Sequence, residues 1–226
     1  MERRAGGAVT ISALLPEVEG RYRALALGPH ADDIEIGAGG LLARALAERR
    51  GLTVDFVVLT GDKRRQTEAE ASATELAGGR LGSIGIRLLG MADGRLPSAG
   101  AAPKEEIERL KEGGPYDLVL CPSLGDAHQD HRLVAEVVWQ TFRSAPILEY
   151  EIPKYEGIRE QSNLFVELTR DQCESKIQHL LACFPSQADR GWFDAETFWA
   201  MLRLRGVESA SPTGYAEAFI ARKLRI

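Results

Sequence analysis

The sequence predicts an α/β fold of the Rossmann-like kind, in which a mostly parallel sheet carries helices on both faces. Three observations support this fold class. Apolar segments alternate with segments of helical periodicity up to about residue 146. The apolar segments are continuous or rich in β-branched residues, as strands buried on both faces are. The chain has 226 residues, of which 44% are hydrophobic, so it is long enough to enclose such a sheet.

In this first part we expect four strands and four helices in alternation. The strands are expected at 22–28, 53–60, 85–90 and 116–123. The helices are expected at about 36–50, 65–78, 103–113 and 129–143. Gly51 follows the first helix and Pro103 opens the third, and both residue types are common at these helix boundaries.

The pattern changes after about residue 146. Strands are expected at 146–153 and 163–168, and helices at 169–184 and 192–206. Thr169 and Gln172 have the spacing of a capping box at the start of the first of these helices. Because no low-complexity linker or internal repeat separates the two parts, we expect a single domain over residues 1–226, with the C-terminal extension packed on the same domain.

Composition narrows the classes of partner and location. The formal net charge of -5 argues against nucleic acid or an anionic membrane as the partner. The three cysteines, Cys121, Cys173 and Cys183, show no CxxC spacing, so they predict neither a disulfide framework nor a thiolate metal site. No apolar run approaches the ~20 residues of a membrane span. We therefore expect a cytoplasmic protein with no transmembrane segment and no nucleic-acid partner.

Polar side chains gather after two of the predicted strands. The cluster after the first strand holds His30, Asp32 and Asp33. The cluster after the fourth strand holds Asp126, His128, Asp130 and His131. Three of the four histidines of the chain fall in these clusters. Since ligands of open α/β sheets bind beyond the carboxyl ends of the strands, we expect the two clusters to form one site.

The residue types of these clusters suit a metal. Imidazole and carboxylate together are ligands of zinc or another divalent transition metal. His30 and Asp33 suit two ligands from one loop, and His128 or His131 would supply the third. Three protein ligands leave an open position, as in catalytic zinc sites. Asp32 is then free to act as a base toward a water whose pKa the metal lowers toward ~7.

Other interpretations of these residues stay open. A single His-x-x-Asp pair is weak evidence, and Asp130 could simply cap the helix that follows it. Gly37, Gly39 and Gly40 lie at a strand-to-helix turn, but "GAGGLL" is not the G-x-G-x-x-G pattern of nucleotide binding. Close packing of the first helix on the sheet is the better interpretation of these glycines. His179 lies outside both clusters, and we expect it to be a surface or core residue and not a ligand.

The two clusters also resemble the signatures of a known family. "HADDIEIGAGG" resembles the His-Pro-Asp-Asp signature and following Gly-Gly helix of the PIG-L/LmbE-type deacetylases, and "HQDH" resembles their His-x-Asp-His signature. This family includes N-acetylglucosaminyl-phosphatidylinositol de-N-acetylase and bacterial thiol-cofactor deacetylases. The segments "LTGD", "RQTE" and "LLGMADGRLP" are similar as well, so the resemblance covers about 22–143 and resumes at 215–219. Ala31 stands where proline is usual, a departure that removes no functional group.

The resemblance implies a role for each residue of the site. The implied ligands of Zn²⁺, or of another divalent transition metal, are His30, Asp33 and His131. The implied catalytic residues are Asp32 as general base, His128 facing the substrate carbonyl, and Asp130 orienting His128. In that role a histidine works best protonated, with Asp130 or another carboxylate holding the charge. The implied substrate-binding residues are Arg65 and Asp93, with Arg64 as the alternative to Arg65.

The resemblance also implies an activity, which is removal of an N-acetyl group from an amino sugar in a glycoside or glycoconjugate. The partner would then be a small-molecule N-acetylated sugar, and because many family members self-associate, a homo-oligomer is a possible state. Residues 22–143 would form the metal-site core and residues 146–226 a substrate cap. The aromatic residues that could stack on the sugar, although such residues are usually buried, are Trp192, Phe193, Phe198 and Trp199.

Two alternative functions fit the same residues less well. One is a metal-dependent hydrolase of another bond, such as a phosphoester or another amide, although two-metal phosphoesterases usually carry more ligands. The other is a non-catalytic α/β sugar-binding module, against which the intact Asp32 argues.

Overall fold

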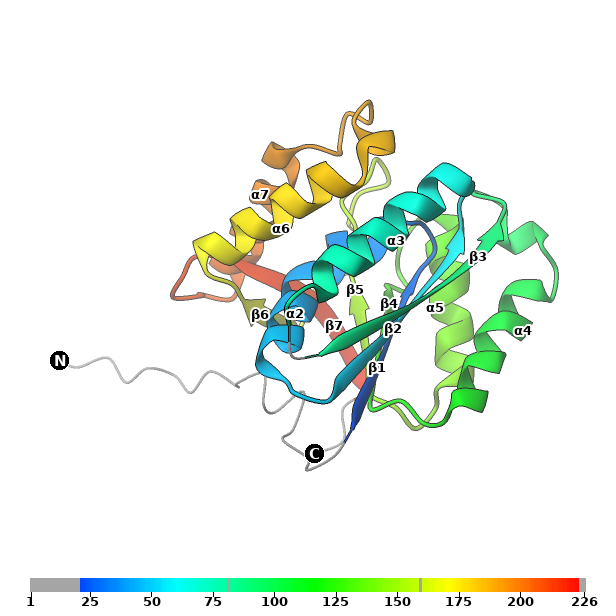
Figure 1. Ribbon diagram of the computed structural model, residues 1–226. Coiled ribbons are helices and arrows are strands. Elements are labelled where there is room, and N and C mark those ends of the chain that lie inside the picture. The colour runs from blue at the N-terminus through cyan, green and yellow to red at the C-terminus, as the bar shows by residue number, and fades with distance from the viewer. Residues whose placement is uncertain (1–20, 81, 159, 224–226) are drawn as a thin grey trace.

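The computed structural model describes residues 21–80, 82–158 and 160–223, shown in Figure 1. Within these residues seven strands form one sheet in the order β3-β2-β1-β4-β5-β7-β6. The neighbouring strands from β3 to β5 are parallel, whereas β7 is antiparallel to both β5 and β6. The mostly parallel α/β sheet predicted from the sequence is confirmed. Residues 1–20 and 224–226 of the expected single domain lie outside the described residues.

The elements have the following bounds. The strands are β1 (Tyr22–Gly28), β2 (Leu52–Thr60), β3 (Ser83–Met91), β4 (Leu118–Pro122), β5 (Ile147–Tyr150), β6 (Leu164–Glu167) and β7 (Ala216–Lys223). The α-helices are α2 (Asp33–Glu48), α3 (Lys63–Ala77), α4 (Ala102–Arg109), α5 (Gln129–Thr141), α6 (Arg170–Cys183) and α7 (Ala195–Glu208). Short 3₁₀ turns are present at Leu96–Ser98, Leu110–Gly113 and Pro185–Gln187.

Most predicted elements lie within a few residues of the observed ones, with two differences. Helix α2 begins at Asp33, earlier than predicted, and places acidic residues in its first turn, where they interact favourably with the helix dipole. Strand β7 has no counterpart among the predicted strands, because Glu217 and Arg222 interrupt its apolar pattern. The predicted capping box of Thr169 and Gln172 is confirmed at the start of α6.

Helices cover both faces of the sheet. Figure 1 shows α4 and α5 on one face and α2, α3, α6 and α7 on the other. Consecutive residues of β1 enter different cores. Ala24 and Ala26 pack under α2, while Leu25 and Leu27 pack toward α5. Burial on both faces explains why this strand is a continuous apolar run. No helix among the described residues is long and apolar enough to cross a bilayer.

The glycines of α2 allow the helix to approach its neighbours closely. A Cβ atom on Gly37 would lie 2.3 Å from the Tyr150 ring, and one on Gly40 would lie 2.5 Å from the Leu168 side chain. Glu217 reaches the same part of the helix, where its carboxylate accepts hydrogen bonds from the backbone N–H groups of Gly40 and Leu41 at 2.6 and 2.7 Å. Close packing of the first helix on the sheet is therefore what these glycines provide.

We predict opposite effects for two alanine substitutions in α2. Gly37→Ala should lower the free energy of unfolding by about 1–3 kcal/mol, because the new methyl group overlaps Tyr150. Gly39→Ala is the matched control, since its Cβ would meet nothing closer than 3.8 Å. It should be neutral or stabilising by up to about 1 kcal/mol, the gain in helix propensity. Urea unfolding of both variants tests this, and equal stabilities would contradict the packing of α2 described above.

Candidate functional site

Both polar clusters lie where the sheet reverses its strand order. From β1 the chain moves outward through β2 to β3 and then returns to β4, so β1 and β4 are neighbours at the switch point. Ligands bind at such points in open α/β sheets. The loop after β1 is held by β2, because Thr60 donates both its backbone N–H and its hydroxyl to the carbonyl oxygen of Pro29 at 2.9 and 2.7 Å.

Three buried side-chain atoms able to coordinate a metal converge at the centre of the site. Asp33 Oδ2 lies 2.9 Å from His30 Nδ1 and 3.2 Å from His131 Nε2, and the two nitrogens are 3.2 Å apart. A tetrahedral zinc ion with bonds of about 2.0–2.1 Å to nitrogen and oxygen holds such ligand atoms roughly 3.3 Å apart. The triangle of His30, Asp33 and His131 therefore has the dimensions of a transition-metal site.

Further side chains able to coordinate a metal surround His30. One ring nitrogen from each of His30, His128 and His131 can be chosen so that the three atoms lie within 4.8 Å of one another. On the other side of the His30 ring, Nε2 lies 3.0 Å from Asp93 Oδ1 and 3.5 Å from Asp130 Oδ2. The structure thus brings both sequence clusters, together with Asp93, around one imidazole.

Asp126 fixes the orientation of the His131 ring. Its Oδ2 lies 2.7 Å from His131 Nδ1, and its Oδ1 accepts a hydrogen bond from the His128 backbone at 2.8 Å. A carboxylate on the far nitrogen of a histidine is the usual device for fixing the orientation of a metal ligand. Sequence reasoning placed Asp126 in the cluster but gave it no role.

Asp130 was expected either to cap the helix that follows it or to orient His128, and its contacts fit neither role. His128, and not Asp130, is the N-cap residue of α5, and its Nδ1 accepts the Asp130 backbone N–H at 3.3 Å. The Asp130 carboxylate points away from His128, with Oδ1 accepting from the Leu96 backbone at 3.1 Å and Oδ2 beside His30. Asp130 therefore neither caps the helix nor orients His128 through its carboxylate.

The surroundings of His128 favour the neutral ring over the protonated one that was expected. Burial lowers the pKa of this imidazole, and the nearby His131 and His30 lower it further. Because Nδ1 accepts a backbone hydrogen bond, the proton of the neutral ring is on Nε2. In its neutral form His128 is thus a hydrogen-bond donor beside His30 and His131.

Asp32 has one oxygen paired and one free. Arg65 donates to its Oδ1 at 2.7 Å. Its Oδ2 is buried and has no hydrogen-bond partner among the described residues, so it can accept a proton. Arg64 instead lies 3.6 Å from Glu68 with two thirds of its side chain exposed, which leaves Arg65 as the arginine of the site.

Lys154 is the residue that sequence reasoning missed. Its ammonium lies 3.1 Å from Asp33 Oδ1 and 3.1 Å from His131 Nε2. Burial raises the pKa of Asp33, but His131 and Lys154 lower it more, so the carboxylate is ionised. Lys154 follows β5, and the strand-tip rule that identified the other residues could have identified it too.

The C-terminal aromatic residues divide into two groups. Phe193 and Phe198 are buried in the core. Trp192 is partly buried and its ring lies 5.6 Å from the Lys154 ammonium, so this ring borders the site. Trp199 is partly buried as well and stacks against Arg170.

Comparison with known proteins identifies the family. The model of the family PIG-L, described as GlcNAc-PI de-N-acetylase, matches residues 25–142, just over half of the chain and a range that contains both clusters. The chain belongs to the PIG-L family. The PIG-L fold is also seen in solved structures. N,N'-diacetylchitobiose deacetylase from Pyrococcus horikoshii has a TM-score of 0.68 at 21% identity, with 92% of this chain and 87% of that chain covered.

Two further structures share the PIG-L fold. The A40926 pseudoaglycone deacetylase Dbv21 has a TM-score of 0.65 at 19% identity, covering 91% of this chain and 100% of that one. GalB, the 4-carboxy-2-hydroxymuconate hydratase from Pseudomonas putida, has a TM-score of 0.70 at 18% identity, covering 91% and 98%. At these identities the likeness concerns the fold, and the fold serves more than one reaction.

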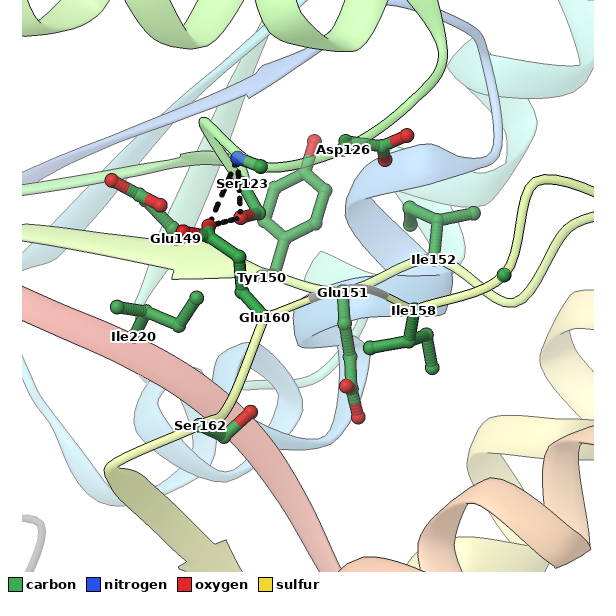
Figure 2. Close-up of a pocket in the computed structure, with 12 residues that line it drawn as sticks. Ser123, Asp126, Glu149, Tyr150, Glu151, Ile152, Ile158, Glu160, Ser162 and Ile220 are labelled. Carbon is green, nitrogen blue, oxygen red and sulfur yellow. Dashed lines mark hydrogen bonds between the residues drawn. The ribbon is translucent and has the colours of Figure 1, made fainter.

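In this PIG-L chain two carboxylates hold the loop between β4 and α5. Glu149 is buried and accepts from the Leu124 backbone at 3.0 Å. Glu160 accepts from the Ser123 hydroxyl and from the Gly125 backbone, as Figure 2 shows, and it also pairs with Arg222 of β7. The loop that leads into Asp126 and α5 is therefore fastened from the C-terminal half of the chain.

We predict that Glu160→Gln lowers the free energy of unfolding at pH 7 by about 1–2 kcal/mol, because charge-assisted hydrogen bonds are lost at a partly exposed position. Burial raises the pKa of Glu160, but hydrogen bonds from Arg222 and Ser123 lower it more, to a net value below 4.5. The stabilisation is therefore complete above pH 4.5 and is lost as the pH falls through the lowered pKa.

Urea unfolding at pH 7 and at acid pH measures this difference. The gap between wild type and Glu160→Gln should narrow on acidification. Glu156→Gln makes the same change at an exposed position of the same segment and should match wild type at both pH values. A gap that is independent of pH would contradict the ionic role of Glu160.

Proposed function

We propose that this protein is a metal-dependent N-deacetylase that hydrolyses the N-acetyl group of an amino sugar within a glycoside or glycoconjugate. The observation that carries the proposal is the convergence of His30, Asp33 and His131 at 2.9–3.2 Å beside Asp32, a carboxylate with one free buried oxygen. Membership of a family described as a de-N-acetylase supports it. So does the shared fold of the N,N'-diacetylchitobiose deacetylase, whose substrate carries N-acetyl groups.

The proposed metal ligands are His30, Asp33 and His131, and the donor set suits Zn²⁺ or another divalent transition metal. When bound, the ion would supply a Lewis acid that polarises the acetyl carbonyl and lowers the pKa of a water toward ~7. His131 Nε2 has one lone pair, so it either accepts from Lys154 or binds the ion. Lys154 would therefore release His131 in the loaded protein while still reaching Asp33.

Asp32 and His128 are the proposed proton-handling residues. Asp32 would take a proton from the attacking water through its free Oδ2, while Arg65 holds Oδ1 in place. His128 would donate its Nε2 hydrogen to the carbonyl oxygen as negative charge develops there. Asp130, whose carboxylate is beside His30, would act by positioning that ligand and not by charging His128.

Substrate recognition is proposed at the rim of the site. The side chain of Asp93 is two thirds exposed although its Oδ1 lies 3.0 Å from His30, so it can accept hydrogen bonds from sugar hydroxyls. Lys154 and Trp192 come from the C-terminal part, residues 146–226, which supports its role as a substrate cap. The decisive assay is acetate release from a panel of N-acetylhexosaminides with and without added metal. A hydratase, as GalB is, would release no acetate from any of them.

We predict that the two adjacent aspartates behave differently. Asp33→Ala should lose bound metal together with activity, because a ligand is removed. Asp32→Asn should keep the metal and lose about 10²–10⁴-fold in kcat, the usual contribution of a general base. Metal content after gel filtration and acetate release measure the two effects. If Asp32→Asn is purified without metal, Asp32 is the ligand and Asp33 the base, the reverse of the proposed roles.

We also predict that His128 acts as a donor and not as a ligand. His128→Ala should retain the metal content of the wild type and lose about 10²–10³-fold in kcat, as expected for a lost hydrogen bond to a developing oxyanion. His128→Gln offers an N–H donor on a side chain of similar reach and should recover part of the rate. If His128→Ala is purified without metal, His128 belongs among the ligands.

A further inference from the structure

A second group of metal-ligating side chains lies between α3 and α6, away from the strand tips. His179 and Cys183 are four residues apart on α6, so they share one face of that helix. Glu75 comes from α3, which runs beside α6 in Figure 1. One donor atom from each of Glu75, His179 and Cys183 can be chosen so that all three lie within 4.8 Å of one another.

The distances within this group match those of a coordinated ion. Cys183 Sγ lies 3.3 Å from Glu75 Oε2 and 3.8 Å from His179 Nδ1, while His179 Nδ1 lies 3.4 Å from Glu75 Oε1. A tetrahedral ion with bonds of about 2.3 Å to sulfur and about 2.1 Å to nitrogen and oxygen holds its ligand atoms roughly 3.4–3.6 Å apart. An ion can therefore be accommodated with small side-chain movements.

The contacts of the imidazole allow it to present Nδ1 to the group. His179 Nε2 lies 2.8 Å from the Ser72 hydroxyl, which in turn donates to Glu35 Oε1 at 2.5 Å. When the hydroxyl donates to Glu35 it accepts from His179 Nε2–H, and in that tautomer the lone pair of Nδ1 faces Glu75 and Cys183. Burial lowers the pKa of His179, so the ring is neutral at neutral pH, as a ligand must be. This chain of contacts orients His179 as outer-shell partners orient metal-bound histidines.

The group also has access to solvent. His179 and Glu75 line a cavity of about 390 Å³ whose wall includes Glu35, Arg44 and Arg80. More than half of the Glu75 side chain is exposed, so an ion can reach the site without unfolding of the helices. Three protein ligands leave a fourth position for water or another ligand.

We propose that Glu75, His179 and Cys183 bind one divalent transition-metal ion, separate from the ion of the strand-tip site. The thiolate and imidazole favour zinc or cobalt over magnesium or calcium. The expectation that the cysteines form no thiolate site rested on the missing CxxC spacing, but here the spacing is i, i+4 on one helix and the third ligand comes from another helix.

Binding involves the loss of one proton. Burial and the neighbouring Glu75 carboxylate raise the pKa of the Cys183 thiol to about 12 in the metal-free protein. The ion replaces the thiol proton on sulfur, the S–H bond gives way to a sulfur–metal bond, and the proton passes to solvent.

Cobalt provides the test because it reports thiolate coordination directly. The full chain is stripped of metal, titrated with Co²⁺, and followed by near-ultraviolet absorption and by metal content. We expect about two ions per chain and a sulfur-to-cobalt charge-transfer band, since the strand-tip site contains no cysteine. Cys183→Ala, His179→Ala and Glu75→Gln should each bind about one ion and keep acetate-releasing activity. The band should vanish in Cys183→Ala and weaken or shift in the other two.

Two controls separate this site from the proposed active site. Cys173→Ala removes a buried cysteine of the same helix that is not in the group, and it should keep the band and both ions. His131→Ala should lose the strand-tip ion and activity yet keep the band. A wild-type protein without the band, or a band that persists in Cys183→Ala, would overturn the proposal. Because Glu75 is exposed, Glu75→Gln tests it even if a core variant fails to fold.

Discussion

A fully buried carboxylate, that of Asp33, is the constraint on which the strand-tip site depends. Removing a carboxylate from water is costly unless it is paired and hydrogen-bonded. Asp33 meets this requirement with His30, His131 and Lys154, which contact its two oxygens at 2.9–3.2 Å. Each partner comes from a different strand end, after β1, β4 and β5, and these three strands are consecutive in the sheet. Stabilising the charge of this one side chain thus requires the segments that follow three strands to lie close together.

The position of Asp33 in turn depends on how α2 packs. Asp33 is the first residue of this helix, and one turn later Gly37 lies against the Tyr150 ring. The Tyr150 hydroxyl donates to the Leu27 carbonyl of β1 at 2.6 Å, so one aromatic side chain joins β5, β1 and the helix. A small residue at position 37 therefore matters for the chemistry as well as for packing, because any movement of the helix would move the carboxylate.

The sequence was sufficient to predict the parallel part of the sheet and the convergence of the two polar clusters, for physical reasons. Parallel strands buried on both faces are continuous apolar runs, and their carboxyl ends meet at one edge, so His30 and Asp33 could be grouped with His128 and His131 from their positions after strands. The choice of His131 over His128 as a ligand came from the family resemblance. The contacts of Asp130 could not be predicted, because they depend on which way a side chain points from the first turn of α5. Lys154 was missed because a single lysine after a strand is common.

Contacts between helices were the least predictable part. Nothing in the sequence links Glu75 to Cys183, since they are brought together only when α3 packs on α6. Strand β7 was not predicted for the same reason, because it too depends on contacts with distant parts of the chain. Its Glu217 is acceptable in a buried position only because Lys176 and the backbone of α2 are there to meet it, and local sequence contains no sign of either partner.

The place of β7 in the sheet has a consequence for the order in which the chain can fold. It is the last of the described strands along the sequence, yet it lies inside the sheet, and β6 pairs with it alone among them. Its Glu217 also reaches α2 across a separation of 177 residues. Contacts of such long sequence separation close late, because the intervening chain must first be ordered. The first five strands can therefore pair before β7 has formed, whereas β6 gains its partner strand, and the loop fastened by Arg222 gains its anchor, only once β7 is in place.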